Sequence, residues 1–188
     1  MQKNISMLII CAAACIPVLA QASHAPYAGQ QTRQIKALSS EEIQEYLQGQ
    51  GMGLAKAAEL NHYPGPKHVL ELASKLRLSQ EQVAATRRIY DKMHGEAAHL
   101  GGQIVDEEKQ LDRLFSSGRI CRNDMEAAVS KIARLQGELR AVHLGAHLEM
   151  KQQLSSDQRR KYEQLRGYQS GGHLHQSHKH VEREDHER

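Results

Sequence analysis

The chain has 188 residues, with 25 Lys and Arg, 22 Asp and Glu, a formal net charge of +3 and 12 His. It has no Trp, six Tyr and one Phe, and its mean hydropathy is −0.64. This length suits one domain, the few aromatic residues exclude a large sandwich or barrel core, and the hydropathy excludes a protein with many membrane spans.

Residues 1–22 predict a secretory signal peptide. Lys3 provides a basic start, an apolar run follows from Met7, and small residues precede a cleavage site after Ala22. The run is shorter than the ~20 residues of a spanning helix, and a lipoprotein modified at Cys15 lacks the usual large apolar residue three places earlier. We therefore expect an exported protein without a nucleic-acid partner.

Export leaves Cys121 as the only cysteine of the mature chain. It cannot form an internal disulfide, so it pairs with another chain, stays a free, partly buried thiol, or takes a metal-binding or redox role.

Helical signals continue from Ser39 to Gly167, and no segment alternates as a strand does. Capping signatures, each with Glu or Gln three places after the capping residue, predict four helix starts: Ser39 with Glu42, Ser79 with Gln82, Asn123 with Glu126, and Ser155 with Gln158. The predicted helices cover residues 40–48, 54–60, 68–76, 80–115, 124–153 and 156–166.

The two longest helices carry apolar residues at alternating spacings of three and four, and a short Ser/Gly loop joins them. This pattern predicts an all-α fold built on a long antiparallel helical hairpin with short flanking helices. We divide the chain into the signal peptide (1–22), an N-terminal extension with short helices (23–65), the hairpin domain (66–168) and a disordered His-rich tail (169–188). The apolar stripes are narrow, so we expect a homodimer or packing by the short helices.

One sequence motif occurs twice. Leu78–Gln82 and Leu154–Gln158 are both Leu-Ser-x-x-Gln, and the chain thereby resembles the LTxxQ-motif family of periplasmic proteins, with Ser in place of Thr. This family contains Spy/CpxP-like chaperones and heavy-metal sensor or resistance proteins. The resemblance implies a small helical fold that dimerises into a curved cradle, without catalysis. It also implies binding of unfolded periplasmic proteins without ATP, or binding of a metal that is reported to the envelope-stress machinery.

The resemblance does not transfer a complete metal site. Metal-sensing members use a His-x-x-x-His pair before the first motif and a His-x-x-x-Met pair before the second. Here only His68 precedes the first motif, and Ala146 stands four residues before Met150, where the His of that pair would be. The neighbouring His143 and His147 are candidates to replace it.

A different constellation suggests a metal site in the hairpin. His143, His147 and Met150 share one helical face, and a turn near residue 120 brings His94 and Asp91 level with them on the partner helix. Imidazoles at this spacing chelate Zn, Ni or Cu, and a thioether favours softer ions. We expect a site formed by His94, His143 and His147, with Asp91 or Met150 completing it. The alternative is that these histidines pack at a polar rim.

Four further histidines cluster near the C-terminus, at His173, His175, His178 and His180. A flexible segment of this kind can gather around one ion, although ordering it costs entropy. The alternative is a solvated low-complexity tail.

We find no Gly-rich phosphate loop, no Cys-x-x-Cys and no His-Glu-x-x-His, so we expect no enzyme and no organic cofactor. The leading hypothesis is a periplasmic divalent-metal-binding protein (Zn, Cu or Ni) of metal resistance or envelope-stress sensing. The alternative is an ATP-independent holdase. Expected partners are a second copy of the chain and either unfolded periplasmic proteins or a membrane-bound sensor.

Overall fold

The computed structural model describes residues 25–168, and within them the chain is helical, with one isolated β-bridge and no strand. This confirms the predicted all-α class. The predicted signal peptide (1–22) and His-rich tail (169–188) lie outside the described residues. The helices are α1 (Ser40–Leu47), α2 (Lys56–Glu59), α3 (Pro66–Glu71), α4 (Gln80–Ser116), α5 (Arg122–Gln153) and α6 (Ser156–Arg166), after a 3-10 helix at Gln30–Thr32.

The chain divides into two compact units, residues 1–32 and 33–188. In the described part of the first unit, a turn leads into the 3-10 helix. At this turn the amide of Gln30 donates to the carbonyl of Tyr27 over 3.0 Å. All that follows concerns the second unit.

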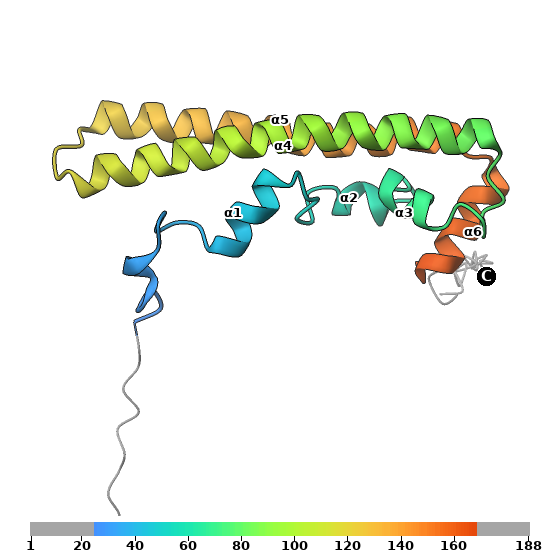
Figure 1. Cartoon of the computed structure of the whole chain (residues 1–188), viewed down its shortest axis with the longest axis horizontal. Coiled ribbons are helices and arrows are strands. Elements are labelled where there is room, and N and C mark those ends of the chain that lie inside the picture. The colour runs from blue at the N-terminus through green and yellow to red at the C-terminus, as the bar shows by residue number, and fades with distance from the viewer. Residues whose placement is uncertain (1–24, 169–188) are drawn as a thin grey trace, which may run out of the picture. The chain divides into compact units, whose positions relative to one another are not determined.

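The long hairpin is formed by α4 and α5, which lie antiparallel along their whole length (Figure 1). Lys92 and Glu149 face each other at 3.8 Å toward one end, and Lys131 donates to Glu107 over 2.7 Å toward the other. These pairs fit the predicted register. Between them, small and aliphatic side chains close the seam, including Ala97, Ile104, Leu135 and Leu139.

Three of the four predicted helix caps are confirmed as complete capping boxes, those of Ser39, Ser79 and Ser155. The fourth is wrong, because α5 already begins at Arg122 and Asn123 lies inside its first turn. Cys121, in extended conformation, occupies the N-cap position without a side-chain cap bond. The Cys121 thiol is also exposed rather than partly buried, and it donates to Asp124 Oδ2 over 3.0 Å.

The two Leu-Ser-x-x-Gln motifs meet at the α6 end of the hairpin, where we call Gln82 and Gln158 the glutamine pair. Gln82 Nε2 donates to Gln158 Oε1 over 2.9 Å, and Gln158 Nε2 donates back to Gln82 Oε1 over 3.0 Å. Gln82 also donates to the carbonyl of Gln153 over 2.8 Å. Each glutamine additionally closes its own capping box, so the repeated motif fixes α6 against the start of α4.

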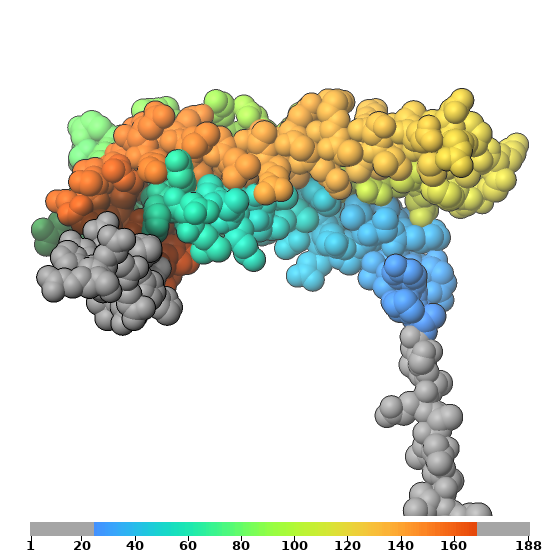
Figure 2. All heavy atoms as spheres, turned by 180° about the vertical axis from the view of Figure 1, so that it is seen from behind, coloured from blue at the N-terminus to red at the C-terminus, as the bar shows by residue number. Residues whose placement is uncertain are grey.

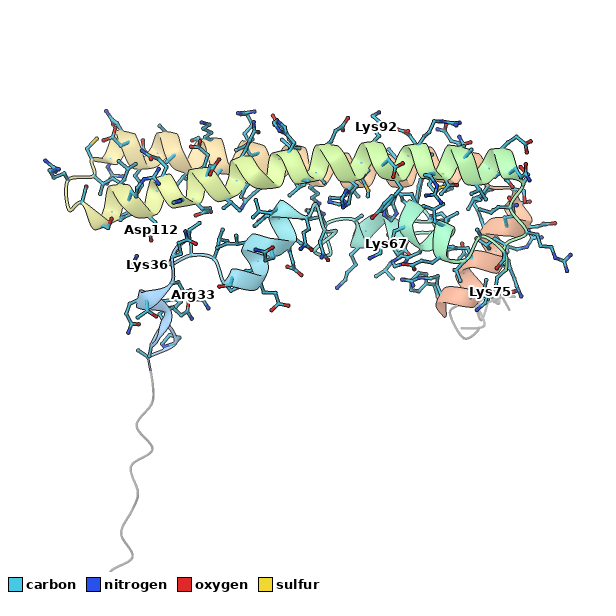
Figure 3. The ribbon with its side chains drawn as sticks, viewed as in Figure 1. Arg33, Lys36, Lys67, Lys75, Lys92 and Asp112 are labelled. Carbon is cyan, nitrogen blue, oxygen red and sulfur yellow. The ribbon has the colours of Figure 1, made fainter. Side chains whose placement is uncertain are left out.

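Residues 33–72, which we call the strap, run along one face of the hairpin and contain α1, α2 and α3 (Figure 1). In the view from behind, α2 and α3 lie against α5 (Figure 2). At one end Ile35 and Leu38 pack on Val105, and Lys36 Nζ meets Asp112 Oδ2 at 3.1 Å (Figure 3).

Close backbone contacts seat the strap on α4. A Cβ at Gly101 would overlap the backbone carbonyl of Tyr46, and a Cβ at Gly49 would lie 2.7 Å from the carbonyl oxygen of His94. Gly49 also has a positive φ of 58°, which residues with a side chain rarely adopt. Glycine is therefore required at both positions for α1 and its C-terminal turn to lie this close to α4.

Across residues 25–168, no helix combines the length and the apolar character that crossing a membrane requires.

Candidate functional site

A pocket of about 830 Å³ lies between the strap and the hairpin. The Gly-rich stretch 49–53 forms part of its wall and contributes few side chains to fill it. The other wall comes from α4 and α5, and its lining is largely apolar with several imidazoles among it. The residues that bear on its chemistry are Leu47, Met52, Glu59, Leu60, His68, Tyr90, Met93, His94, His143, His147 and Tyr168.

His143 is the most deeply buried imidazole of the pocket, with 3 % of its surface exposed. Its Nε2 is buried and has no hydrogen-bond partner among residues 25–168. Burial lowers the pKa of His143, the neighbouring His147 and His94 lower it further, and a hydrogen bond to the Gln50 backbone opposes them. The imidazole is therefore neutral at pH 7, which is the form that binds a metal ion.

His147 lies one helical turn further along α5 and is 8 % exposed. Its Nδ1 is 2.7 Å from the carbonyl oxygen of Tyr63. A carbonyl only accepts, so Nδ1 carries the proton and Nε2 of the neutral ring keeps its lone pair. A backbone acceptor behind one ring nitrogen is the arrangement that orients ligating histidines in metal sites.

Glu59 of α2 ties the strap to α6 beside His147. Its carboxylate accepts from the Tyr162 hydroxyl over 2.5 Å and from the amide of Gly65 over 3.1 Å, while Arg166 Nε lies 3.5 Å away. Burial, and next the bond to Glu59, raise the pKa of Tyr162, which stays protonated. Glu59 Oε2 is also 3.7 Å from His147 Nδ1, so the carboxylate supports the imidazole from behind.

The structure brings together three of the residues predicted from the sequence, because His94 lines the same pocket as His143 and His147. His94 is exposed, and its ring centroid lies 5.5 Å from that of Tyr90. Asp91 is exposed and is not part of the pocket lining. Met150 is fully buried in an apolar cluster with Val69, Leu76, Leu154 and Tyr162, apart from the pocket.

No three His, Cys, Asp or Glu side chains within residues 25–168 are grouped closely enough to hold a metal ion. The three imidazoles line one pocket without converging on one point. The remaining predicted ligands, His173, His175, His178 and His180, lie outside the described residues.

Sequence reasoning missed the contribution of the strap to this pocket. Gln50, Glu59 and Tyr63 reach the histidines from a stretch that the pattern marks only as turns and a short helix. The available signal was the repeated glycine at 49, 51 and 53, followed by Pro64-Gly65-Pro66. Such spacing marks close backbone approach, and a Cβ at Gly65 would lie 2.9 Å from the His147 ring.

The other histidines have different neighbours. His68 lies at the pocket wall with its Nδ1 3.0 Å from Glu71 Oε2. His62 pairs with Glu163 at 2.9 Å, and His99 is exposed on α4, as predicted.

A family model described as heavy-metal resistance matches residues 53–161. The match covers more than half of the chain and includes both Leu-Ser-x-x-Gln motifs, Glu59 and the pocket histidines. No curated protein and no solved structure matches the chain significantly.

Proposed function

Because the chain belongs to the heavy-metal resistance family, we propose that it binds a divalent metal ion in the pocket between the strap and the hairpin. One observation carries this proposal: the buried Nε2 of His143 has no partner within residues 25–168, in a pocket that three further imidazoles line. An unpaired buried polar atom costs roughly 1–3 kcal/mol. A bound ion would remove this cost.

The donor set fits zinc, copper or nickel. His143 and His147 lie four residues apart on α5, so one face of the helix presents both rings. Imidazole nitrogen suits these three ions better than it suits Mg²⁺ or Ca²⁺. When bound, the ion would be held by ring nitrogens, and Tyr63 and Glu59 would keep the His147 ring oriented.

We propose that the protein binds and exchanges the metal without chemical conversion, in the periplasm to which residues 1–22 would direct it. The family resemblance supports a homodimer as the working assembly. It also supports a membrane-bound sensor as a partner that detects the loaded state.

A competition titration with zinc and copper tests the proposal on the mature chain. We expect His143→Ala together with His147→Ala to weaken binding by at least about tenfold. The control is His99→Ala, because His99 is an exposed imidazole on α4 that does not line the pocket. Unchanged affinity in the double variant would contradict a pocket site.

A second function is supported by the apolar rim of the same pocket. Leu47 and Leu60 line it and are 46 % and 55 % exposed, and Met52 adds an adaptable side chain. An ATP-independent holdase would use such a rim to hold unfolded segments. Suppression of client aggregation in metal-free buffer tests this function. Leu47→Ser with Leu60→Ser should abolish the suppression, whereas His143→Ala should leave it intact.

A further inference from the structure

The two imidazoles of α5 are oriented by residues 49–65 of the strap, which we call the clasp. The carbonyl of Tyr63 accepts from His147 Nδ1 over 2.7 Å, and His143 has its hydrogen bond to the Gln50 backbone. A backbone acceptor of this kind determines which ring nitrogen carries the proton and how the ring is turned. The groups that prepare both rings for an ion therefore belong to the clasp and not to the hairpin.

The clasp has little structure of its own. Its helix, α2, is four residues long, and none of those residues is buried. A helix this short is not stable in water by itself, so α2 depends on its packing against α5. We therefore expect the amides of α2 to exchange with solvent whenever the clasp leaves the hairpin.

Contacts at its two ends hold the clasp in place. The Glu59 carboxylate accepts from the Tyr162 hydroxyl over 2.5 Å and from the amide of Gly65 over 3.1 Å, so it joins the clasp to α6. At the other end Gly49 lies directly against α4, where a Cβ would be 2.7 Å from the carbonyl oxygen of His94. The clasp is thus anchored by polar and backbone contacts rather than by a buried apolar face, and one additional link to α5 would strengthen its docking.

From these contacts we infer that metal binding and docking of the clasp are coupled, so that the clasp is held closed over the loaded pocket and opens more readily when the ion leaves. The inference rests on the proposed function, since it concerns the regulation of that site. The ion binds best to oriented rings, and only the docked clasp orients them. By linkage, the factor by which docking strengthens metal binding equals the factor by which the metal strengthens docking. Loss of such outer contacts weakens metal binding about 10- to 100-fold.

Hydrogen exchange at the amides of residues 55–65, with and without zinc, tests the inference on the mature chain. We expect saturating zinc to slow this exchange at least about tenfold, including at Gly65, whose amide lies 3.4 Å from a hydroxyl of α6. The pocket variant, His143→Ala with His147→Ala, should show no slowing, even if zinc binds elsewhere on the chain. Unchanged exchange in the natural protein with zinc bound, or equal slowing in the pocket variant, would overturn the coupling. Absence of zinc binding by the natural chain would instead refute the proposed function.

A glycine variant tests the converse and leaves every imidazole unchanged. Gly49→Ala adds a methyl group that has no room against α4, so it should displace the clasp and weaken zinc binding at least about tenfold. The matched control is Gly118→Ala. Gly118 has a φ of 65°, close to the 58° of Gly49, but its Cβ would meet nothing within 4 Å and it does not line the pocket. Both variants therefore carry similar backbone strain, and only Gly49→Ala disturbs the clasp. Equal zinc affinities in the two variants would overturn the inference.

Discussion

The glutamine pair and the pocket both place polar side chains inside the molecule, but they differ in how those groups are satisfied. At the glutamine pair, each amide donates to and accepts from the other, and each also closes a capping box. In the pocket, His143 is more deeply buried than either glutamine, yet its Nε2 has no partner within residues 25–168. A satisfied polar network fixes one arrangement of the chain, whereas an unpaired buried group keeps the cost of its desolvation.

Tyr162 lies between the two regions and should have the largest effect on stability. Among residues 25–168 it is the largest fully buried side chain, and it packs with Val69 and Leu76 while its hydroxyl bonds to Glu59. Tyr162→Ala should lower the free energy of unfolding by about 3–5 kcal/mol in urea denaturation. Tyr162→Phe, which keeps the ring, should cost only about 1–3 kcal/mol. Equal losses in the two variants would mean that the hydroxyl bond, rather than packing, dominates.

Breaking the glutamine pair should have the next largest effect. Gln158→Ala removes the partner of the Gln82 amide and one capping bond, so we expect a loss of about 1–3 kcal/mol. The double variant Gln82→Ala with Gln158→Ala should lose less than the sum of the single losses, because the two residues share one network. Strict additivity in denaturation measurements would show that each glutamine acts only as a local cap.

His143→Leu should not destabilise the protein, unlike the variants of the glutamine pair. Replacing a buried ring whose Nε2 is unpaired by an apolar side chain of similar size should leave stability unchanged or raise it by up to about 1 kcal/mol. The same variant should bind zinc at least about tenfold more weakly. A loss of stability comparable to that of Gln158→Ala would show that His143 is a structural group like the glutamines.

The smallest expected effect is a dependence of stability on pH. The pKa of His143 is lowered in the folded protein, chiefly by burial, so below about 6.5 the unfolded chain takes up the proton first. Stability should therefore fall as the pH drops through 6.5, and it should level off below the folded-state pKa. Urea midpoints at pH 7.5 and 5.5 should differ more in the natural protein than in His143→Leu. The same difference in both proteins would assign the dependence to other groups.

The sequence predicted features that depend on local patterns better than contacts between distant segments. Ser79 and Ser155 could be identified as caps because a capping box needs only four consecutive residues, and the long hairpin followed from its apolar spacing. Asn123 failed as a cap because α5 begins at Arg122, which places Asn123 inside the first turn and two residues after the N-cap position at Cys121.

The pocket was only partly predictable. The register of the hairpin places His94, His143 and His147 in the lining of one pocket. Contacts from Tyr63 and Glu59 depend on where the strap docks, and no pattern within the strap encodes that position. Met150 lies on the same helix as His147, but the packing of α3 and α6 encloses it in an apolar cluster.

The glycine contacts described for the strap have a mechanical consequence. Gly49 and Gly101 mark two places where backbone meets backbone without a side chain between them. If α1 slid along α4 by one turn, side chains would enter both contacts, so no intermediate position is available to it. The two contacts therefore hold α1 in one register on α4, and hydrogen exchange at the amides of α1 measures how often that register is lost.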